Sequence, residues 1–147
     1  MKVKPEYENL DEWNSLANSI AQKHPERFGG LDLAKIKAVV ITNKDKPDDP
    51  DKVFDVVPVK MPVKMDCPFS YYVVYWTSDW ATRDEEHKLV AVAKAMRAIP
   101  TDDKEEGKVF PPNMKDFSDL VLTLGPDYLN KPKIPHLLRD NIKWIYR

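Results

Sequence analysis

The segment 69–76, with the sequence FSYYVVYW, limits the fold of this chain more than any other stretch. Its β-branched and aromatic side chains favour an extended strand over a helix. Both alternating sets of side chains are apolar, so neither face of such a strand can lie against water. We therefore predict a central strand that is covered on both sides.

Two more strands are predicted ahead of this one. Residues 35–42 are rich in β-branched side chains, and residues 53–60 form a second extended run that contains Pro58. Because a proline cannot donate a hydrogen bond to a neighbouring strand, the second run is expected at a sheet edge. The polar, proline-broken stretch 43–52 between them is predicted to be a loop.

Apolar residues recur at helical spacing in three other segments. These segments are residues 10–23, 84–99 and 113–124. Pro25 and Pro100 end the first two, because the residue before a proline resists the α-helical region. Gly125, followed by Pro126, ends the third.

Capping boxes are predicted at the starts of the first two helices, from Asn9 with Glu12 and from Thr82 with Glu85. The order of elements is helix, three strands, helix, loop, helix. It predicts a single α+β domain over residues 1–147, with helices packed against a mostly antiparallel sheet of three to four strands. Residues 128–147 are expected to dock on this body.

Composition excludes some classes of function. The 23 basic and 24 acidic residues give a formal net charge of −1, so binding driven by the phosphates of a nucleic-acid duplex is not the default expectation. The single cysteine, Cys67, cannot form an internal disulfide, which favours a cytoplasmic location. The sequence has no apolar run of about 18 residues, the length that a membrane span requires.

A collinear set of motifs between residues 15 and 138 is similar to a known family. A helix ends at His24-Pro25, a central strand ends in aromatic residues, and an acidic triplet precedes the next helix. Further on come Gly107-Lys108, a helix around Phe117, and the runs LGPDYL (124–129) and IPHLL (134–138). In this order the motifs resemble the phage-type metallopeptidases, a family of small zincin-like proteins.

The resemblance implies a fold whose chemistry has been lost. In that family the helix after the central strand carries H-E-x-x-H, which places two imidazoles on one zinc ion and a glutamate beside the bound water. The matching positions here are Lys94, Ala95 and Ala98, and a third ligand would fall near Pro112-Asn113. A protonated lysine and an alanine offer zinc no donor atom. We therefore expect no metal, no cofactor and no catalytic residue at these positions.

Two alternatives concern the same helix. It can be an ordinary helix that never held a metal, since Ala and Lys are common helix formers. It can also belong to a hydrolase with a relocated metal site, built from His87 with Asp84 or Glu86, and His136. The remaining histidine, His24, has no His or Cys at ligand spacing.

Aromatic and basic residues raise a third possibility, binding to a nucleic acid. The aromatic run of the central strand lacks interleaved Arg and Lys, so core packing is expected instead of base stacking. The C-terminal tail combines aromatic and basic side chains and is the place where a nucleic-acid contact is plausible: Lys131, Lys133, Arg139, Lys143, Trp144, Tyr146 and Arg147.

The function expected from these observations is that of a non-catalytic, metallopeptidase-like protein. Its partner is expected to be a protein or an extended peptide, received by strand addition in the groove between the edge of the sheet and the helix 84–99. Cys67 has no surrounding motif and is expected to be a packed side chain.

Overall fold

A computed structural model describes residues 4–42, 53–101, 107–109, 120, 123–124, 128–130 and 132–144 of the chain. These residues form a four-stranded sheet packed against helices, so the predicted α+β class is confirmed. Within these ranges, no helix has the length and apolar character needed to cross a membrane.

The sheet has the strand order β1-β2-β4-β3. Its strands are β1 (Glu6–Asn9), β2 (Ile36–Thr42), β3 (Phe54–Pro58) and β4 (Tyr71–Trp76). The pairs β1–β2 and β3–β4 are antiparallel, and β2–β4 is parallel. The central position of β4 and the edge position of β3 are as the apolar pattern and Pro58 predict.

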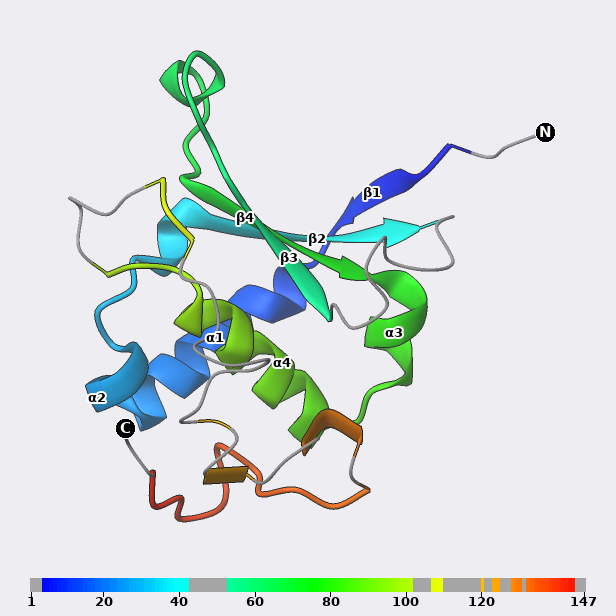
Figure 1. Cartoon of the computed structure of the whole chain (residues 1–147), viewed down its shortest axis with the longest axis vertical. Coiled ribbons are helices and arrows are strands. Elements are labelled where there is room, and N and C mark those ends of the chain that lie inside the picture. The colour runs from blue at the N-terminus through cyan, green and yellow to red at the C-terminus, as the bar shows by residue number, and fades with distance from the viewer. Residues whose placement is uncertain are drawn as a thin grey trace.

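The helices lie on one face of this sheet (Figure 1). The two long helices are α1 (Asp11–Lys23) and α4 (Glu85–Arg97), which pack against each other. The short helices are α2 (Pro25–Phe28) and α3 (Thr77–Thr82). Single 3-10 turns are η1 (Leu33–Lys35), η2 (Val63–Met65) and η4 (Tyr128–Asn130).

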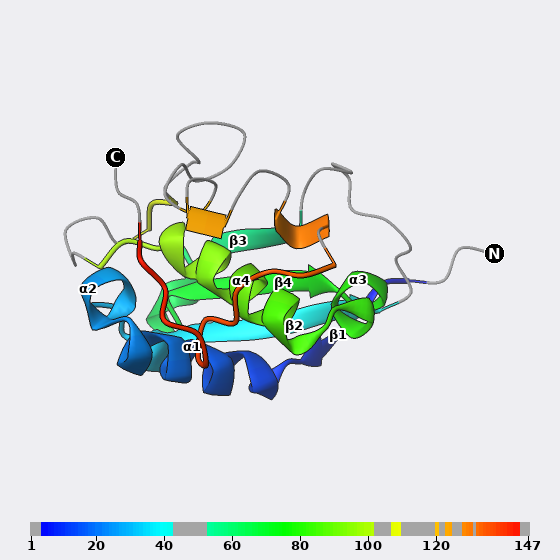
Figure 2. The same cartoon turned by 90° about the horizontal axis from the view of Figure 1, so that it is seen from below.

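A third layer is formed by the C-terminal segment 132–144, which crosses α4 on the side away from the sheet (Figure 2). Three of its side chains, those of Ile134, Leu137 and Trp144, belong to the main core cluster. α4 is therefore enclosed between the sheet and this segment, and eight of its side chains are buried.

Successive side chains of β2 and β4 point to opposite faces of the sheet, and the buried ones therefore form two groups. Ile36, Ala38 and Val40 of β2 and their register partners Tyr71, Val73 and Tyr75 face the helices and join the main core. The intervening residues form a second, smaller cluster on the opposite face: Val39, Ile41, Val74 and Trp76. The apolar character of both faces of segment 69–76 corresponds to these two clusters.

Two local predictions are wrong. Both predicted capping boxes are absent: the residue before α1 is Leu10, the residue before α4 is Asp84, and neither helix has a side-chain cap. Asn9 instead ends β1, because pairing with β2 determines the conformation there. The Thr82 hydroxyl donates to the carbonyl of Asp79, within α3. Most of the predicted helix 113–124 lies outside the described residues.

The hydroxyl of Tyr75 joins three elements of the core. It donates a hydrogen bond to the carbonyl of Ala91 in α4 at 2.9 Å and accepts one from Nε1 of Trp13 in α1 at 3.1 Å. Burial raises the pKa of Tyr75, and the hydrogen bond from Trp13 and the charge of Arg83 offset only part of that increase. The phenol therefore remains protonated in the folded chain across the ordinary pH range.

We predict that the free energy of unfolding falls as the pH rises above about 10. Tyrosine in the unfolded chain ionises there, whereas the buried Tyr75 holds its proton. This residue therefore lowers the free energy of unfolding by about 1.4 kcal/mol for each pH unit above that point. Tyr75→Phe should lack this contribution. It should also lower the neutral-pH stability by about 1–3 kcal/mol, because two buried partners lose their bonds.

Urea unfolding at pH 7 and at several values above 10 measures both effects. Tyr7→Phe is the matched control for the neutral-pH loss, since Tyr7 is 65% exposed. Equal alkaline slopes for the wild type and Tyr75→Phe would contradict the assignment.

Candidate functional site

The positions matched to the metal-binding motif lie near the C-terminal end of α4. Ala95 is completely buried and Ala98 is 3% exposed, so both methyl groups are part of the core. The Nζ atom of Lys94 lies 5.7 Å from the centre of the Tyr128 ring, as in a cation–π contact. Pro112 and Asn113 lie outside the described residues.

These three positions do not form an open coordination site. A catalytic zinc ion needs three protein donor atoms and an accessible position for water or substrate. The two alanines supply no donor atoms, and the helix face that bears them is packed within the core cluster. Lys94 supplies an ammonium group that is held over an aromatic ring. The chemistry available here is packing, not coordination.

The acidic start of α4 brings together a different set of possible ligands. Asp84, Glu86 and His87 each place one donor atom so that all three atoms lie within 4.8 Å of one another. Two atoms bound to one zinc ion are separated by at most about 4.4 Å, so small side-chain rotations would allow shared coordination. Asp84 is exposed and His87 is buried.

His136 does not join this set. Its Nδ1 atom accepts hydrogen bonds from the backbone N–H groups of Leu138 at 3.2 Å and Arg139 at 3.1 Å. Its Nε2 atom lies 3.6 Å from Oε1 of Glu85. The imidazole therefore organises a turn of the C-terminal segment and faces the carboxylate of Glu85.

His24 connects the end of α1 to the same C-terminal segment. Its Nε2 atom donates to the carbonyl of Leu137 at 2.6 Å, since a carbonyl can only accept. Its Nδ1 atom accepts from Nε1 of Trp144 at 3.3 Å, since an indole can only donate. Both hydrogen bonds require the neutral imidazole with the proton on Nε2. His24 is thus a structural residue and is not a ligand.

The aromatic residues near the centre of the sheet are mostly inside the protein. Tyr71, Tyr75 and Trp80 belong to the main core, which agrees with packing, so these three rings are not exposed to bases. Trp144 of the basic tail is also buried, against His24 and Phe28. Its indole is therefore not available for stacking on a base.

Cys67 is a free, half-buried thiol beside the ring of Tyr72. The Sγ atom lies 3.7 Å from the Tyr72 hydroxyl. This hydrogen bond is the largest of three effects that raise the pKa of Tyr72. The other two are the burial of its hydroxyl and the electrostatic interaction with Cys67. No activating base contacts the thiol among the interactions seen here, so the arrangement fits a packed side chain.

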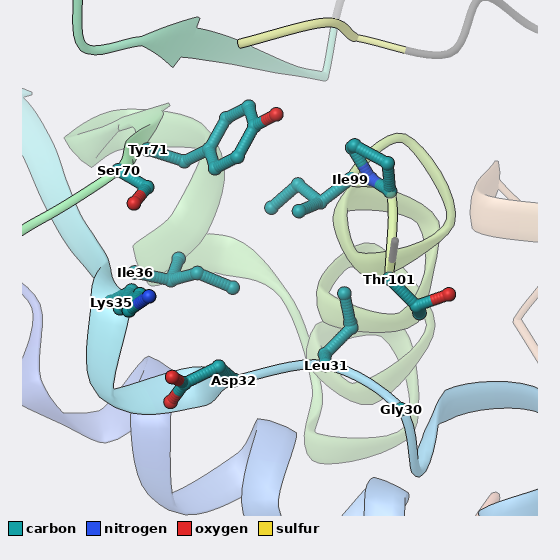
Figure 3. Close-up of a pocket in the computed structure, with 10 residues that line it drawn as sticks. Gly30, Leu31, Asp32, Lys35, Ile36, Ser70, Tyr71, Ile99 and Thr101 are labelled. Atoms are coloured by element: carbon teal, nitrogen blue, oxygen red, sulfur yellow. The ribbon is translucent and has the colours of Figure 1, made fainter. Parts of the chain in front are cut away.

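A small pocket lies where α4 ends. It has a volume of about 100 Å³ and is walled by four chain segments, as Figure 3 shows. The segments are 30–32, 35–36, 70–71 and 99–101. Sequence reasoning missed it because no motif marks it, and its walls come together only through the parallel pairing of β2 with β4.

Comparisons with protein-family models, curated proteins and solved structures give no match to this chain. The resemblance to the phage-type metallopeptidases therefore stays a prediction.

We predict that His24→Ala loosens the C-terminal segment. The carbonyl of Leu137 and the indole of Trp144 would lose their partner, at a cost of about 2–3 kcal/mol in unfolding free energy. The emission of Trp144 should shift to longer wavelength as its ring meets water. Lys23→Ala, at the exposed neighbouring position, is the control. Unchanged emission and stability in His24→Ala would count against this role.

Proposed function

We propose that this chain is a non-catalytic, metallopeptidase-like protein that binds an extended peptide at the edge of its sheet beside α4. The position of β3 at the end of the sheet is the observation that carries the proposal. Among the described residues β3 pairs with β4 alone, while α4 packs against it. An added strand gains main-chain hydrogen bonds at such an edge without requiring a particular sequence.

The side chains around this edge support a binding role. Val57 of β3 is 43% exposed, which provides apolar surface for alternate side chains of a bound strand. Pro58 ends β3 and lacks an N–H group, which limits how far pairing can extend in that direction. The bound segment is therefore short, about the length of β3 itself.

The absence of catalysis in this proposal is supported by the burial of the motif positions. The side chains of Ala95 and Ala98 have no donor atoms and almost no contact with solvent, so a substrate bound at β3 would meet no activated water there. The peptide would be held and released intact.

We predict that octapeptides selected from a random library bind this protein through their backbone. N-methylation at alternate positions should remove the N–H groups that face β3 and weaken binding by about tenfold or more. N-methylation at the intervening positions should have little effect. Isothermal titration calorimetry measures the difference, and mass spectrometry should detect no cleavage.

Two protein variants test the location. Val57→Ser should weaken the selected peptides, whereas Tyr7→Ser, at an exposed residue of the opposite edge strand, should not. Failure to select any peptide would refute the proposal, as would cleavage that a chelator abolishes.

A relocated metal site is a second candidate, favoured by the convergence of Asp84, Glu86 and His87. One imidazole and two carboxylates form a donor set that zinc accepts. The backbone N–H groups at the start of α4 oppose a cation, because they carry the positive end of the helix dipole. The carboxylates must therefore outweigh that effect for an ion to bind.

For this second candidate we predict that one zinc ion binds per chain and that His87→Gln weakens zinc binding by at least about tenfold. His136→Gln is the matched control, since that imidazole faces Glu85 and lies outside the cluster. Competition with a chromogenic chelator measures both affinities. Equal, weak binding by the wild type and both variants would eliminate the candidate.

A further inference from the structure

Three rigid apolar side chains line the pocket at the end of α4, beside several polar groups. Ile36, Tyr71 and Ile99 are each at most 5% exposed, so their positions are fixed by the core behind them. The Tyr71 hydroxyl also accepts from the backbone N–H of Gly107 and donates to the carbonyl of Lys108, both at 2.8 Å. The ring therefore cannot swing away to enlarge the pocket.

The size of the pocket restricts what can enter it. Its volume of about 100 Å³ is smaller than the roughly 150 Å³ of an engineered cavity that takes benzene. A branched aliphatic group of three or four carbon atoms is of the right size. Gly30 and Thr101 lie close together in the lining, because a methyl group in place of a hydrogen of Gly30 would lie 3.2 Å from the side chain of Thr101.

The rim of the pocket adds two opposite charges from one turn. Asp32 precedes η1 and Lys35 ends it, and both side chains are exposed. In the ranges that the structure describes, neither charged group has a hydrogen-bond or ion-pair partner. Figure 3 shows both on the same side of the pocket as the hydroxyl of Ser70, away from Ile99.

We propose that this pocket binds a branched aliphatic α-amino acid of the size of valine or leucine. The side chain occupies the space between Ile36, Tyr71 and Ile99. The ammonium group of the ligand pairs with Asp32 and its carboxylate with Lys35. The pocket is separate from the edge of β3, so this site does not depend on the proposed peptide-binding function.

The test is a titration of the ¹⁵N-labelled chain with L-leucine, L-valine and glycine, followed by amide chemical shifts. Leucine and valine should move the resonances of residues 30–36, 70–71 and 99–101. Each buried methylene strengthens binding by roughly fourfold, so glycine should produce no shifts at the same concentration. Equal shifts with glycine, or none with leucine, would overturn the proposal.

Variants at the rim separate the contribution of shape from that of charge. Thr101→Phe should close the pocket and abolish leucine binding, whereas Thr101→Ser should retain leucine binding. Both variants should fold, because Thr101 is exposed. Asp32→Asn and Lys35→Met should each weaken binding by about two- to fivefold, the range of an exposed ion pair. Undiminished binding by Thr101→Phe would place the ligand elsewhere.

A neutral analogue distinguishes a free amino acid from a residue inside a peptide. N-acetyl-leucine amide keeps the side chain and lacks both charges, so it should bind more weakly than leucine. Binding as tight as that of leucine would refute the role of Asp32 and Lys35. The peptide experiment at β3 is unaffected by either result.

Discussion

The buried hydroxyl of Tyr75 fixes how the two long helices sit on the sheet. A buried phenol is costly unless both its donor and its acceptor capacities are used. Here the donor goes to the carbonyl of Ala91 and the acceptor to the indole of Trp13, which belong to different helices. The bond to Ala91 sets the rotation of α4 about its axis, because a carbonyl at another angle could not be reached from β4.

That rotation determines the environment of the positions matched to the metal-binding motif. Ala95 follows Ala91 by four residues and lies on the same face of α4, and Ala98 follows one turn later. All three are at most 3% exposed. A glutamate side chain at 95 and an imidazole at 98 would collide with the packed core, whereas methyl groups let α4 approach α1 closely. At these positions the side chains therefore contribute packing within the core.

The parts of the fold that the sequence predicts are those with a local pattern. The apolar segment 69–76 and the periodic segment 84–99 are both found as a central strand and a buried helix. β1 has no such pattern, since its four residues are all exposed, and it is a strand because β2 offers it a partner. The bond between His24 and Trp144 spans 120 residues, so no window of sequence could reveal it. The candidate pocket is hidden for the same reason.

The two ends of α4 differ in what they can offer a ligand. At its start, Asp84, Glu86 and His87 present donor atoms, but the helix dipole opposes a cation there. At its end, Ile99 and Pro100 form a wall of the pocket directly after the buried Ala98. A donor atom at position 98 would face the core and not this pocket. At this end of the helix, the choice of ligand would therefore depend on the volume of the pocket and on the charges of its rim.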